Sequence, residues 1–409
     1  DRSHDASSSI LCGWGGAGAY SDGKLNLSCE IGGQLQKIVG HAALEALIKE
    51  VDEMYVRFGA SDNVYGGDTD AVLEFHRRAA HADLKLISTR IRHIGTEVCL
   101  DVLDAIRTTL LDNIEFRPDT AVERIITEDG EVNGVLLEDG SKLWSEYVIV
   151  APGREGSEWL AGETKRLGLA GMNNPVDIGV RVEVPAAIMA PITDELYESK
   201  FVFASKSFDD EVRTFCMCPR GEVVLEENKG LVTVNGHSYS SRFTDNTNFA
   251  VLVSTRFTEP FDQPITYGKY VASLANMLGK GVIVQRLGDL RAGRRSTPKR
   301  IEKGTMAPTL KDATPGDLSF VLPYRYLTGI LEMMEALDKV APGINSRFTL
   351  MYGVEVKFYS SRVELDSTLE TPIKNLYAVG DGAGITRGLV QASVSGLVSA
   401  RSILRKQDG

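Results

Sequence analysis

The segment Asn375-Leu-Tyr-Ala-Val-Gly-Asp-Gly-Ala-Gly-Ile-Thr-Arg-Gly-Leu-Val-Gln-Ala-Ser-Val-Ser-Gly396 is the most informative part of the chain. It predicts a short apolar strand, a glycine-rich turn that contains one acid, Asp381, and a helix from about Gly388 to Leu404. A strand that leads into a tight glycine turn and a helix N-terminus can hold an anionic or polar cofactor. Taken alone, an ordinary strand-turn-helix of an α/β domain explains the segment equally well.

Residues 114–153 indicate several strands joined by tight turns. The pairs Asp129-Gly130 and Asp139-Gly140 are strong hairpin signals between apolar runs. Tyr147-Val-Ile-Val-Ala-Pro-Gly153 is a continuous apolar run, which is typical of a strand buried on both faces of a parallel sheet. Strands before it are expected over residues 114–117, 121–127 and 132–137. Together they predict a parallel sheet with a small antiparallel meander.

Apolar residues recur at helical spacing in several other segments. Helices are expected within residues 33–59, 68–82, 96–111, 267–278 and 327–337, and further strands over 84–88, 176–184 and 353–359. The alternating segment Val176–Val184 is taken as the start of a second lobe. Helices and strands that are mixed in this way predict an α/β protein.

Composition narrows the class of protein. The chain has 409 residues and a net charge of −11, with no basic tract, which argues against nucleic acid as the main partner. No apolar run is long enough to span a membrane. Five cysteines, an odd number, favour a reducing compartment, and the cytoplasm is the expected location. The six histidines show no metal-ligand spacing, so no metal site is expected.

A glycine-rich loop near the start of the chain, from Gly13 to Lys24, formally satisfies G-x-G-x-x-G through Gly13, Gly15 and Gly18. The strand before it would be only three residues long, and a turn signal, not a helix start, follows it. It is therefore not a dinucleotide fingerprint. Two interpretations stay open: a surface loop, or a loop pressed against a flat cofactor.

The C-terminal segment resembles the second flavin-contacting motif of FAD-dependent oxidoreductases with a glutathione-reductase-like fold. The matching residues are Tyr377, Ala378, Gly380 and Asp381. The resemblance implies that Asp381 contacts the ribityl or pyrophosphate part of FAD. It also implies that the following helix directs its positive end at the flavin, which favours the reduced form.

Eight segments in order, among them Gly13–Lys24, Ala151-Pro-Gly153 and Phe215-Cys-Met-Cys-Pro219, resemble the bacterial and archaeal FAD-dependent dehydrogenases, also called NAD(FAD)-utilising dehydrogenases. The resemblance implies a set of cofactor-binding residues: Gly15, Gly16, Gly18, Ser21, Lys24, Ala151, Gly153, Gly380, Asp381, Gly382, Gly384 and Gly388. The family begins with a strand-GxGxxG-helix unit that this sequence lacks, and we expect the chain to be a fragment of a longer protein.

The expected architecture is a glutathione-reductase-like FAD-binding domain with an inserted mixed α+β substrate domain. The FAD-binding domain is assigned to residues 1–175 and 350–409, without its first βαβ unit, and the substrate domain to residues 176–349.

The expected function is that of a FAD-dependent oxidoreductase that transfers a hydride through flavin N5 to or from a small organic substrate. His237 and Tyr239 are candidate proton donors, and Arg295, beside Arg294, is a candidate carboxylate clamp. NAD(P)H as a transient electron donor, an electron-transfer partner and a homo-oligomer are left open. One alternative is a scaffold subunit that has lost its FAD site. Another is a flavoenzyme that modifies RNA, although the negative net charge of the chain argues against it.

Two interpretations of Cys216 and Cys218 stay open. Their thiols contact the flavin or the substrate, or both cysteines are structural residues of a strand.

Overall fold

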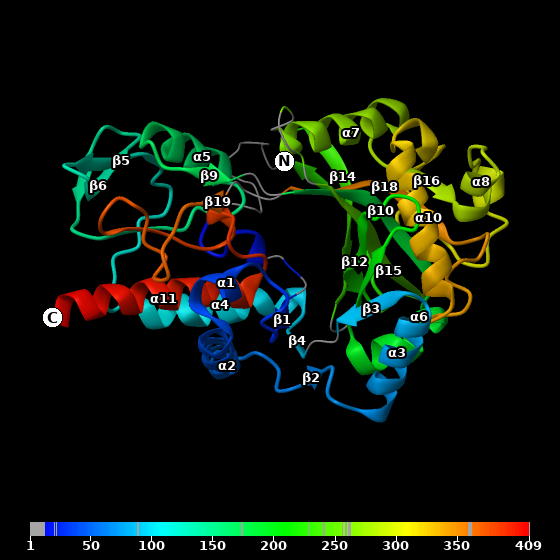
Figure 1. Ribbon diagram of the computed structural model, residues 1–409, viewed down its shortest axis with the longest axis horizontal. Coiled ribbons are helices and arrows are strands. Elements are labelled where there is room, and N and C mark those ends of the chain that lie inside the picture. Colours follow the sequence, from blue (N-terminus) through cyan, green and yellow to red (C-terminus); the bar gives the residue numbers. More distant parts are fainter. Residues whose placement is uncertain are drawn as a thin grey trace. The chain divides into compact units, whose positions relative to one another are not determined.

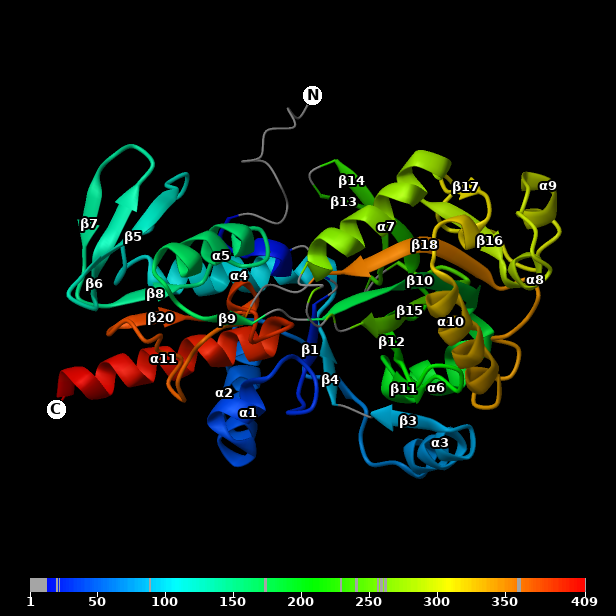
Figure 2. The same ribbon diagram turned by 45° about the horizontal axis from the view of Figure 1, so that its top comes forward.

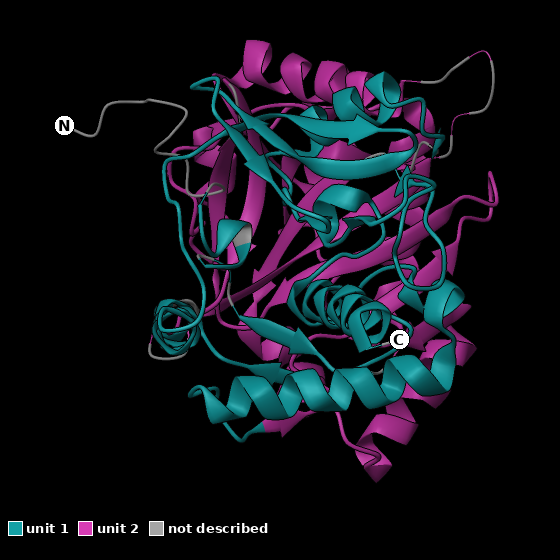
Figure 3. Cartoon of the chain, turned by 90° about the vertical axis from the view of Figure 1, so that its left-hand side faces the viewer, with its two compact units in different colours: residues 1–63, 92–174, 359–409 teal, residues 64–91, 175–358 magenta. Residues whose placement is uncertain are grey.

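The structure of the protein is a computed structural model. It describes residues 13–19, 21, 23–87, 90–172, 175–228, 230–239, 242–255, 257, 260, 263–358 and 362–408. The chain divides into two compact units (Figure 3). Unit 1 comprises residues 1–63, 92–174 and 359–409, and unit 2 comprises residues 64–91 and 175–358. By this division residues 64–91 and 350–358 lie in unit 2, whereas the sequence assigned them to the FAD-binding domain. The mixed α/β class is confirmed.

Unit 1 combines helices with several small sheets (Figure 1). Its helices are α1 (Leu35–Val39), α2 (His41–Arg57), α4 (Thr96–Leu110), α5 (Ser157–Arg166) and α11 (Leu389–Asp408), with 3₁₀ turns η2 (Gly16–Gly18) and η4 (Asp381–Ala383). Its strands are β1 (Lys24–Asn26), β5 (Val122–Glu128), β6 (Glu131–Leu137), β7 (Lys142–Trp144), β8 (Val148–Val150), β9 (Gly171–Met172), β19 (Arg362–Val363) and β20 (Leu376–Ala378). Strand β4 (Ile91–His93) lies at the boundary between the units.

The meander of unit 1 follows from its turn residues. Strands β5, β6 and β7 pair antiparallel in sequence order. Asp129 and Gly130 have φ values of 49° and 82°, as a two-residue hairpin turn requires. The strand expected over residues 114–117 was wrong. No strand is formed there, and the Ile114 amide donates at 3.1 Å to the carbonyl of Leu110, the last residue of α4, so the segment begins in the turn after this helix.

Strands β8 and β20 form a two-stranded parallel sheet, with Leu376 opposite Val148 and Ala378 opposite Val150. The expectation that β8 is buried on both faces was wrong, because Ile149 is 42% exposed. The physical reason is that β8 has a single neighbouring strand in this sheet. The hydrophobic core of unit 1 lies around α2 and α11, whose side chains Tyr55 and Ser393 share a hydrogen bond of 3.2 Å.

Unit 2 is built on an eight-stranded sheet with the order β17-β16-β18-β10-β15-β12-β11-β3 (Figure 1). Its strands are β2 (Val64–Tyr65), β3 (Leu84–Ile87), β10 (Val176–Pro185), β11 (Lys200–Ala204), β12 (Glu211–Cys218), β13 (Glu222–Asn228), β14 (Leu231–His237), β15 (Asn246–Thr255), β16 (Ile283–Arg286), β17 (Thr314–Pro315) and β18 (Leu350–Lys357). Its helices are α3 (Asp70–His81), α6 (Ala186–Leu196), α7 (Pro264–Gly279), α8 (Leu287–Arg291), α9 (Pro298–Ile301) and α10 (Tyr324–Asp338), with the 3₁₀ turn η3 (Leu318–Phe320).

The central strand β10 has one apolar and one polar face, because successive side chains of a strand alternate. Val180 and Val182 belong to the large apolar core, to which α3, α6, α7 and α10 also contribute. Arg181 and Glu183 are fully buried on the opposite face. The separate hairpin of β13 and β14 contacts this polar face, since Asn235 of β14 accepts a hydrogen bond from Arg181.

Gly179 allows β10 and β15 to approach closely. A Cβ atom at this position would lie 1.9 Å from the Val251 carbonyl oxygen. We therefore expect Gly179→Ala to destabilise the protein by about 1–3 kcal/mol, the usual cost of overpacking. Thermal unfolding followed by circular dichroism measures the effect.

The matched control is Gly162→Ala in α5, where a Cβ atom meets nothing within 4 Å. There the gain in helix propensity should leave stability unchanged or raise it by up to about 1 kcal/mol. Equal melting temperatures for the two variants would contradict the close approach at Gly179.

Candidate functional site

Two turns of unit 1 meet at the carboxyl ends of the parallel strands β8 and β20. The turn after β8 contains Ala151 and Gly153, and the turn after β20 contains Gly380 and Gly382. A Cβ atom on Gly382 would lie 2.5 Å from the Gly153 carbonyl oxygen, so the two turns are in backbone contact. The carboxyl ends of parallel strands are where open α/β sheets bind ligands.

Asp381 organises the turn in which it lies. Its Oδ1 accepts hydrogen bonds from the Thr386 hydroxyl at 2.7 Å and from the Gly388 amide at 3.3 Å. Its Oδ2 lies 3.5 Å from Nε of Arg154. The carboxylate therefore fixes the start of α11, while its side chain keeps 19% of its surface exposed. The predicted contact of Asp381 with FAD stays a prediction.

The first glycine loop packs against the helices of the same unit. A Cβ atom on Gly18 would lie 2.6 Å from Leu389, the first residue of α11, and one on Gly15 would lie 2.5 Å from Leu103. The Ser21 hydroxyl donates to the Gly18 carbonyl at 2.9 Å, so it stabilises the loop. Gly16 begins η2, and Lys24 begins β1. Part of the loop, Tyr20 and Asp22, lies outside the described residues.

Three glycines of the predicted set border open space. Gly153, Gly380 and Gly388 have φ values of 64°, 73° and 125°, and a Cβ atom on any of them would meet nothing within 4 Å. Gly384, also with positive φ, closes η4. On the first turn of α11, Oε1 of the buried Gln391 has no hydrogen-bond partner, while its Nε2 donates to the Ile31 carbonyl. Glycine backbone beside open space and a helix N-terminus fit the polar, anionic parts of FAD.

Two of the three predicted catalytic residues lie two positions apart in the sequence, at the end of strand β14. His237 ends β14, and Tyr239 follows two residues later, where the Arg242 guanidinium stacks 4.8 Å from its ring. Arg295 lies on an exposed turn between α8 and α9, and its carbonyl accepts a hydrogen bond from Arg300. These roles stay predictions.

Arg294, the expected partner of Arg295 in a carboxylate clamp, is paired with Asp289 at 2.9 Å. Asp289 is fully buried and also accepts hydrogen bonds from Arg286 and Ser296, at 2.8 Å each. Burial acts to raise the pKa of Asp289, but hydrogen bonds from Arg286, Ser296 and Arg294 outweigh it and lower the pKa to about 2. This cluster holds the turn after α8 together.

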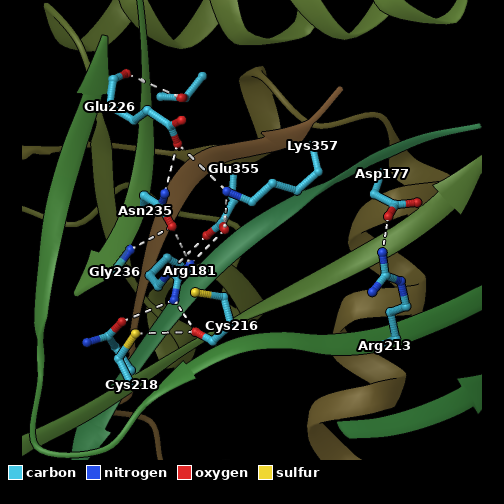
Figure 4. Close-up of polar contacts among 12 residues, drawn as sticks. Asp177, Arg181, Arg213, Cys216, Cys218, Glu226, Asn235, Gly236, Glu355 and Lys357 are labelled. Atoms are coloured by element: carbon cyan, nitrogen blue, oxygen red, sulfur yellow. Dashed lines mark hydrogen bonds and ion pairs between the residues drawn. The ribbon is translucent and has the colours of Figure 1, made fainter. Parts of the chain in front are cut away.

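The polar face of the unit 2 sheet contains a buried ion pair that sequence reasoning missed (Figure 4). Arg181 and Glu355 are both fully buried and form two hydrogen bonds of 2.8 and 2.7 Å. Arg181 also donates to the Cys216 carbonyl at 2.7 Å and to the side chains of Asn235 and Asn248 at 3.1 and 3.2 Å. Burial acts to lower the pKa of Arg181, but the Glu355 carboxylate outweighs it and raises the pKa above its usual value.

Lys357 extends the network to the hairpin. Its ammonium lies 3.2 Å from Glu355 and 3.8 Å from Glu226 of β13 (Figure 4). Burial acts to lower the pKa of Lys357, whereas the two carboxylates outweigh it and raise the pKa. Two cations thus face two anions, and the network is electrically balanced. A sequence signal existed, since charged residues lie at alternate positions between apolar residues in residues 181–184 and 354–357.

Cys216 and Cys218 lie beside this ion pair. The register of β12 against β15 shifts between Phe215 and Cys218, and Cys216 has a φ of 45°. The Cys218 thiol donates to the Cys216 carbonyl at 3.5 Å. The two cysteines therefore belong to an irregular strand end whose backbone is held by Arg181. No observation assigns them to a flavin contact.

The described part of the chain contains no group of three or more His, Cys, Asp or Glu side chains that could hold a metal ion. Within that same part, no helix combines the length and the apolar character that a bilayer crossing requires.

The low pKa of Asp289 predicts a pH-dependent contribution to stability. Its folded-state pKa of about 2 lies below the ordinary value, so the contribution is full above about pH 5 and is lost as pH falls towards 2. Asp289→Asn should therefore lower the free energy of unfolding by about 2 kcal/mol at neutral pH. Below about pH 4 the free energies of unfolding of the variant and the unchanged protein should become more similar. Urea unfolding at several pH values measures it, and a difference that stays constant down to pH 3 would contradict it.

The buried pair Arg181–Glu355 predicts a non-additive response to mutation. Glu355→Gln leaves the buried Arg181 guanidinium without its counterion and should cost about 3–5 kcal/mol. Arg181→Met leaves the Glu355 carboxylate paired with Lys357 alone and should cost less. The double variant should cost less than the sum of the two. Urea unfolding of all four proteins tests the coupling, and strictly additive costs would show that the pair does not act as a unit.

Comparisons with known proteins find sequence similarity over most of unit 2 and over almost the whole chain. Residues 175–358 match the family model "FAD-dependent protein, C-terminal domain-like". An uncharacterized protein of Clostridium beijerinckii is 26% identical over 432 residues, which cover 98% of this chain and 71% of that protein.

Several solved structures show a weaker similarity. A quinol-fumarate reductase with menaquinol has a TM-score of 0.40 at 15% identity, over 98% of this chain and 61% of that chain. Glycine oxidase from Geobacillus kaustophilus has a TM-score of 0.37 at 11% identity, over 95% of this chain and 85% of that chain. L-proline dehydrogenase from P. horikoshii has a TM-score of 0.39 at 10% identity, over 90% of this chain and 79% of that chain. This chain thus spans less than two thirds of the fumarate reductase chain, and TM-scores this low do not define a shared fold.

The family match covers the second segment of unit 2, and the flavin-like motif lies in unit 1. Residues 175–358 are therefore similar to the C-terminal domain of FAD-dependent proteins, and this similarity supports the resemblance of the motifs to the FAD-dependent dehydrogenases.

Proposed function

We propose that this protein is a FAD-dependent oxidoreductase whose unit 1 holds the cofactor. The observation that carries the proposal is the match of residues 175–358 to a FAD-dependent domain in a chain whose unit 1 presents the glycine turns at the ends of β8 and β20. Bound FAD would supply two-electron chemistry, with hydride transfer to or from a small organic substrate through flavin N5. The arrangement in unit 1 is proposed to be glutathione-reductase-like.

The residues of unit 1 would bind and orient the cofactor. Backbone at Gly153 and Gly380 can approach it closely, because no side chain occupies the open space beside these glycines. Asp381 would accept hydrogen bonds from cofactor hydroxyl groups with the part of its carboxylate that remains exposed. The N-terminus of the 20-residue helix α11 would stabilise the negative charge of a bound anionic group.

The residues proposed to act on the substrate lie in unit 2. His237 or Tyr239 would donate a proton, and Arg295 would bind a substrate carboxylate. Arg295 suits this role better than Arg294, because the Arg294 guanidinium already pairs with Asp289. NAD(P)H is not part of the proposal, because neither the family match nor the described geometry supports it.

The alternative is a scaffold subunit without FAD. It would require that the open backbone at Gly153, Gly380 and Gly388 binds no ligand. Flavin titration of the purified protein separates the two functions, and a protein that shows no flavin spectrum even after addition of FAD would favour the scaffold.

Gly380→Ala should weaken FAD binding by at least about tenfold, because its Cβ atom would occupy space assigned to the cofactor. The matched control is Gly130→Ala in the hairpin turn between β5 and β6. Both glycines have positive φ, 73° and 82°, and both border open space. Both variants should lose about 1–2 kcal/mol of stability from the left-handed backbone, but only Gly380→Ala should lose FAD affinity.

Quenching of flavin fluorescence measures the dissociation constants. Equal FAD affinities for the two variants would show that the space at Gly380 is not occupied by the cofactor, even if the unchanged protein binds FAD.

A further inference from the structure

A groove of about 500 Å³ opens at one end of the meander of unit 1. Its lining includes the carboxylates of Glu131 and Glu146 and the indole of Trp144, which is 66% exposed. Figure 2 shows the strands of this meander, β5, β6 and β7, as a separate sheet of unit 1. An aromatic ring beside carboxylates suits an organic cation. The Lys142 ammonium already lies 5.5 Å from the centre of the Trp144 ring.

The turn between β5 and β6 extends this negative surface. Glu128 and Asp129 are exposed, and neither forms an ion pair with any residue that the structure describes. Glu128 accepts a hydrogen bond at 3.2 Å from Asn133, which also lines the groove. Glu131, in contrast, is paired with Lys374 at 2.6 Å. The two carboxylates of the turn therefore keep their negative charge available to a cation.

Asn375 supplies the groove with a hydrogen-bond donor. The residue lines the groove and is only 5% exposed. Its Oδ1 accepts a hydrogen bond from Lys406 at 3.1 Å, whereas its Nδ2 has no hydrogen-bond partner among the described residues. A buried amide without a partner is costly until an acceptor reaches it. A polypeptide segment with basic side chains fits the groove, because its carbonyl oxygens accept hydrogen bonds and its side chains are cationic.

The chain carries such a segment at α8 and α9 of unit 2. Residues 287–303 contain six arginines and lysines and two acids, a net charge of +4 in a chain whose net charge is −11. Lys299 and Lys303 are exposed, and within the described residues neither forms an ion pair. Ile301 anchors the segment, since its side chain is buried in an apolar cluster of unit 2. Figure 2 shows α9 at the periphery of this unit.

We propose that copies of this chain associate head to tail, with residues 298–303 of one copy docked in the groove of the next. The ammonium groups of Lys299 and Lys303 face the carboxylates of the turn, and a carbonyl of the docked segment accepts a hydrogen bond from Asn375. Because the groove and the segment are different surfaces, the contact is heterologous and leaves both ends free to add further copies. This association is independent of the proposed FAD chemistry.

Two acidic molecules can make this contact because salt screens their distant charges. At an ionic strength of about 0.15 M charges interact over about 8 Å, so the local surfaces decide the contact and the net charge of −11 does not. A small organic cation fits the groove less well, because a cation without an acceptor atom leaves the Asn375 amide unsatisfied.

Sedimentation velocity of the full chain over a range of concentrations tests the proposal. The weight-average mass should rise with concentration above that of the monomer, and should fall when salt is raised to about 0.5 M. Lys299→Gln combined with Lys303→Gln should weaken the association about tenfold, because it removes two exposed ion pairs. Trp144→Leu should weaken it about threefold, because it removes the aromatic face.

The two turns of the meander provide a matched control. Glu128→Gln combined with Asp129→Asn should weaken the association about tenfold, and asparagine before glycine keeps the hairpin turn. Glu138→Gln combined with Asp139→Asn makes the same change in the other Glu-Asp-Gly turn, at the opposite end of β6. This control should associate as the unchanged protein does. Circular dichroism checks that all variants fold.

A mixture of two variants tests the pairing of the surfaces directly. The double lysine variant keeps the groove, and the variant of Glu128 and Asp129 keeps the basic segment. Each alone should stay largely monomeric, but the mixture should form dimers that do not grow further.

Three results would overturn the proposal. The first is a protein that stays monomeric at every concentration; if its groove then binds a labelled oligolysine peptide, the groove belongs to a basic partner of another kind. The second is an association that salt does not weaken, or that the control variant of Glu138 and Asp139 weakens as much as the variant of Glu128 and Asp129. The third is a mixture of the two variants that forms no dimers.

Discussion

The fully buried guanidinium of Arg181 is the constraint on which the architecture of unit 2 depends. A buried charge is costly unless it is paired and hydrogen-bonded. Here Glu355 of β18 supplies the countercharge, and the Cys216 carbonyl, Asn235 and Asn248 accept the remaining hydrogen bonds. One side chain of β10 therefore links four other strands: β12, β14, β15 and β18. Any shift in register of these strands would leave the guanidinium unsatisfied, so the ion pair specifies one arrangement of the sheet.

In unit 1 the comparable constraint is steric and depends on glycine. The turn after β20 contacts the turn after β8 at Gly382, where a side chain would collide with the Gly153 backbone. Neighbouring glycines at 153, 380 and 388 have a different role, because their missing side chains leave space open. Glycine thus allows the two turns to pack in backbone contact at one position and leaves space for a ligand at the neighbouring positions. This division of roles explains why the motif contains several glycines within nine residues.

Sequence reasoning succeeded where the determinants are local. Asp129-Gly130 predicted a hairpin because its backbone preference is intrinsic to two residues, and α11 followed from a glycine turn and an apolar period. It failed where the determinants are distant. Ile149 was expected to be buried, but its exposure depends on which strands neighbour β8. The pairing of Arg181 with Glu355 joins residues 174 positions apart, so only the register of two strands reveals it. The motif singled out Asp381 as a candidate, but it did not reveal the hydrogen bonds of this carboxylate to Thr386 and Gly388.

Because the polar groups of the buried network already have hydrogen-bond and ion-pair partners, the network also limits which residues can act on a substrate. Arg181 uses all five of its N–H donors within the protein, and Lys357 faces two carboxylates. Groups whose partners are all internal cannot also bind a substrate without first breaking those contacts. The charges inside the sheet therefore stabilise the fold, and the proposed proton donors His237 and Tyr239 are half-buried groups outside this network. The proposed hydride transfer would need a bound cofactor such as FAD, because neither of these side chains can carry a hydride.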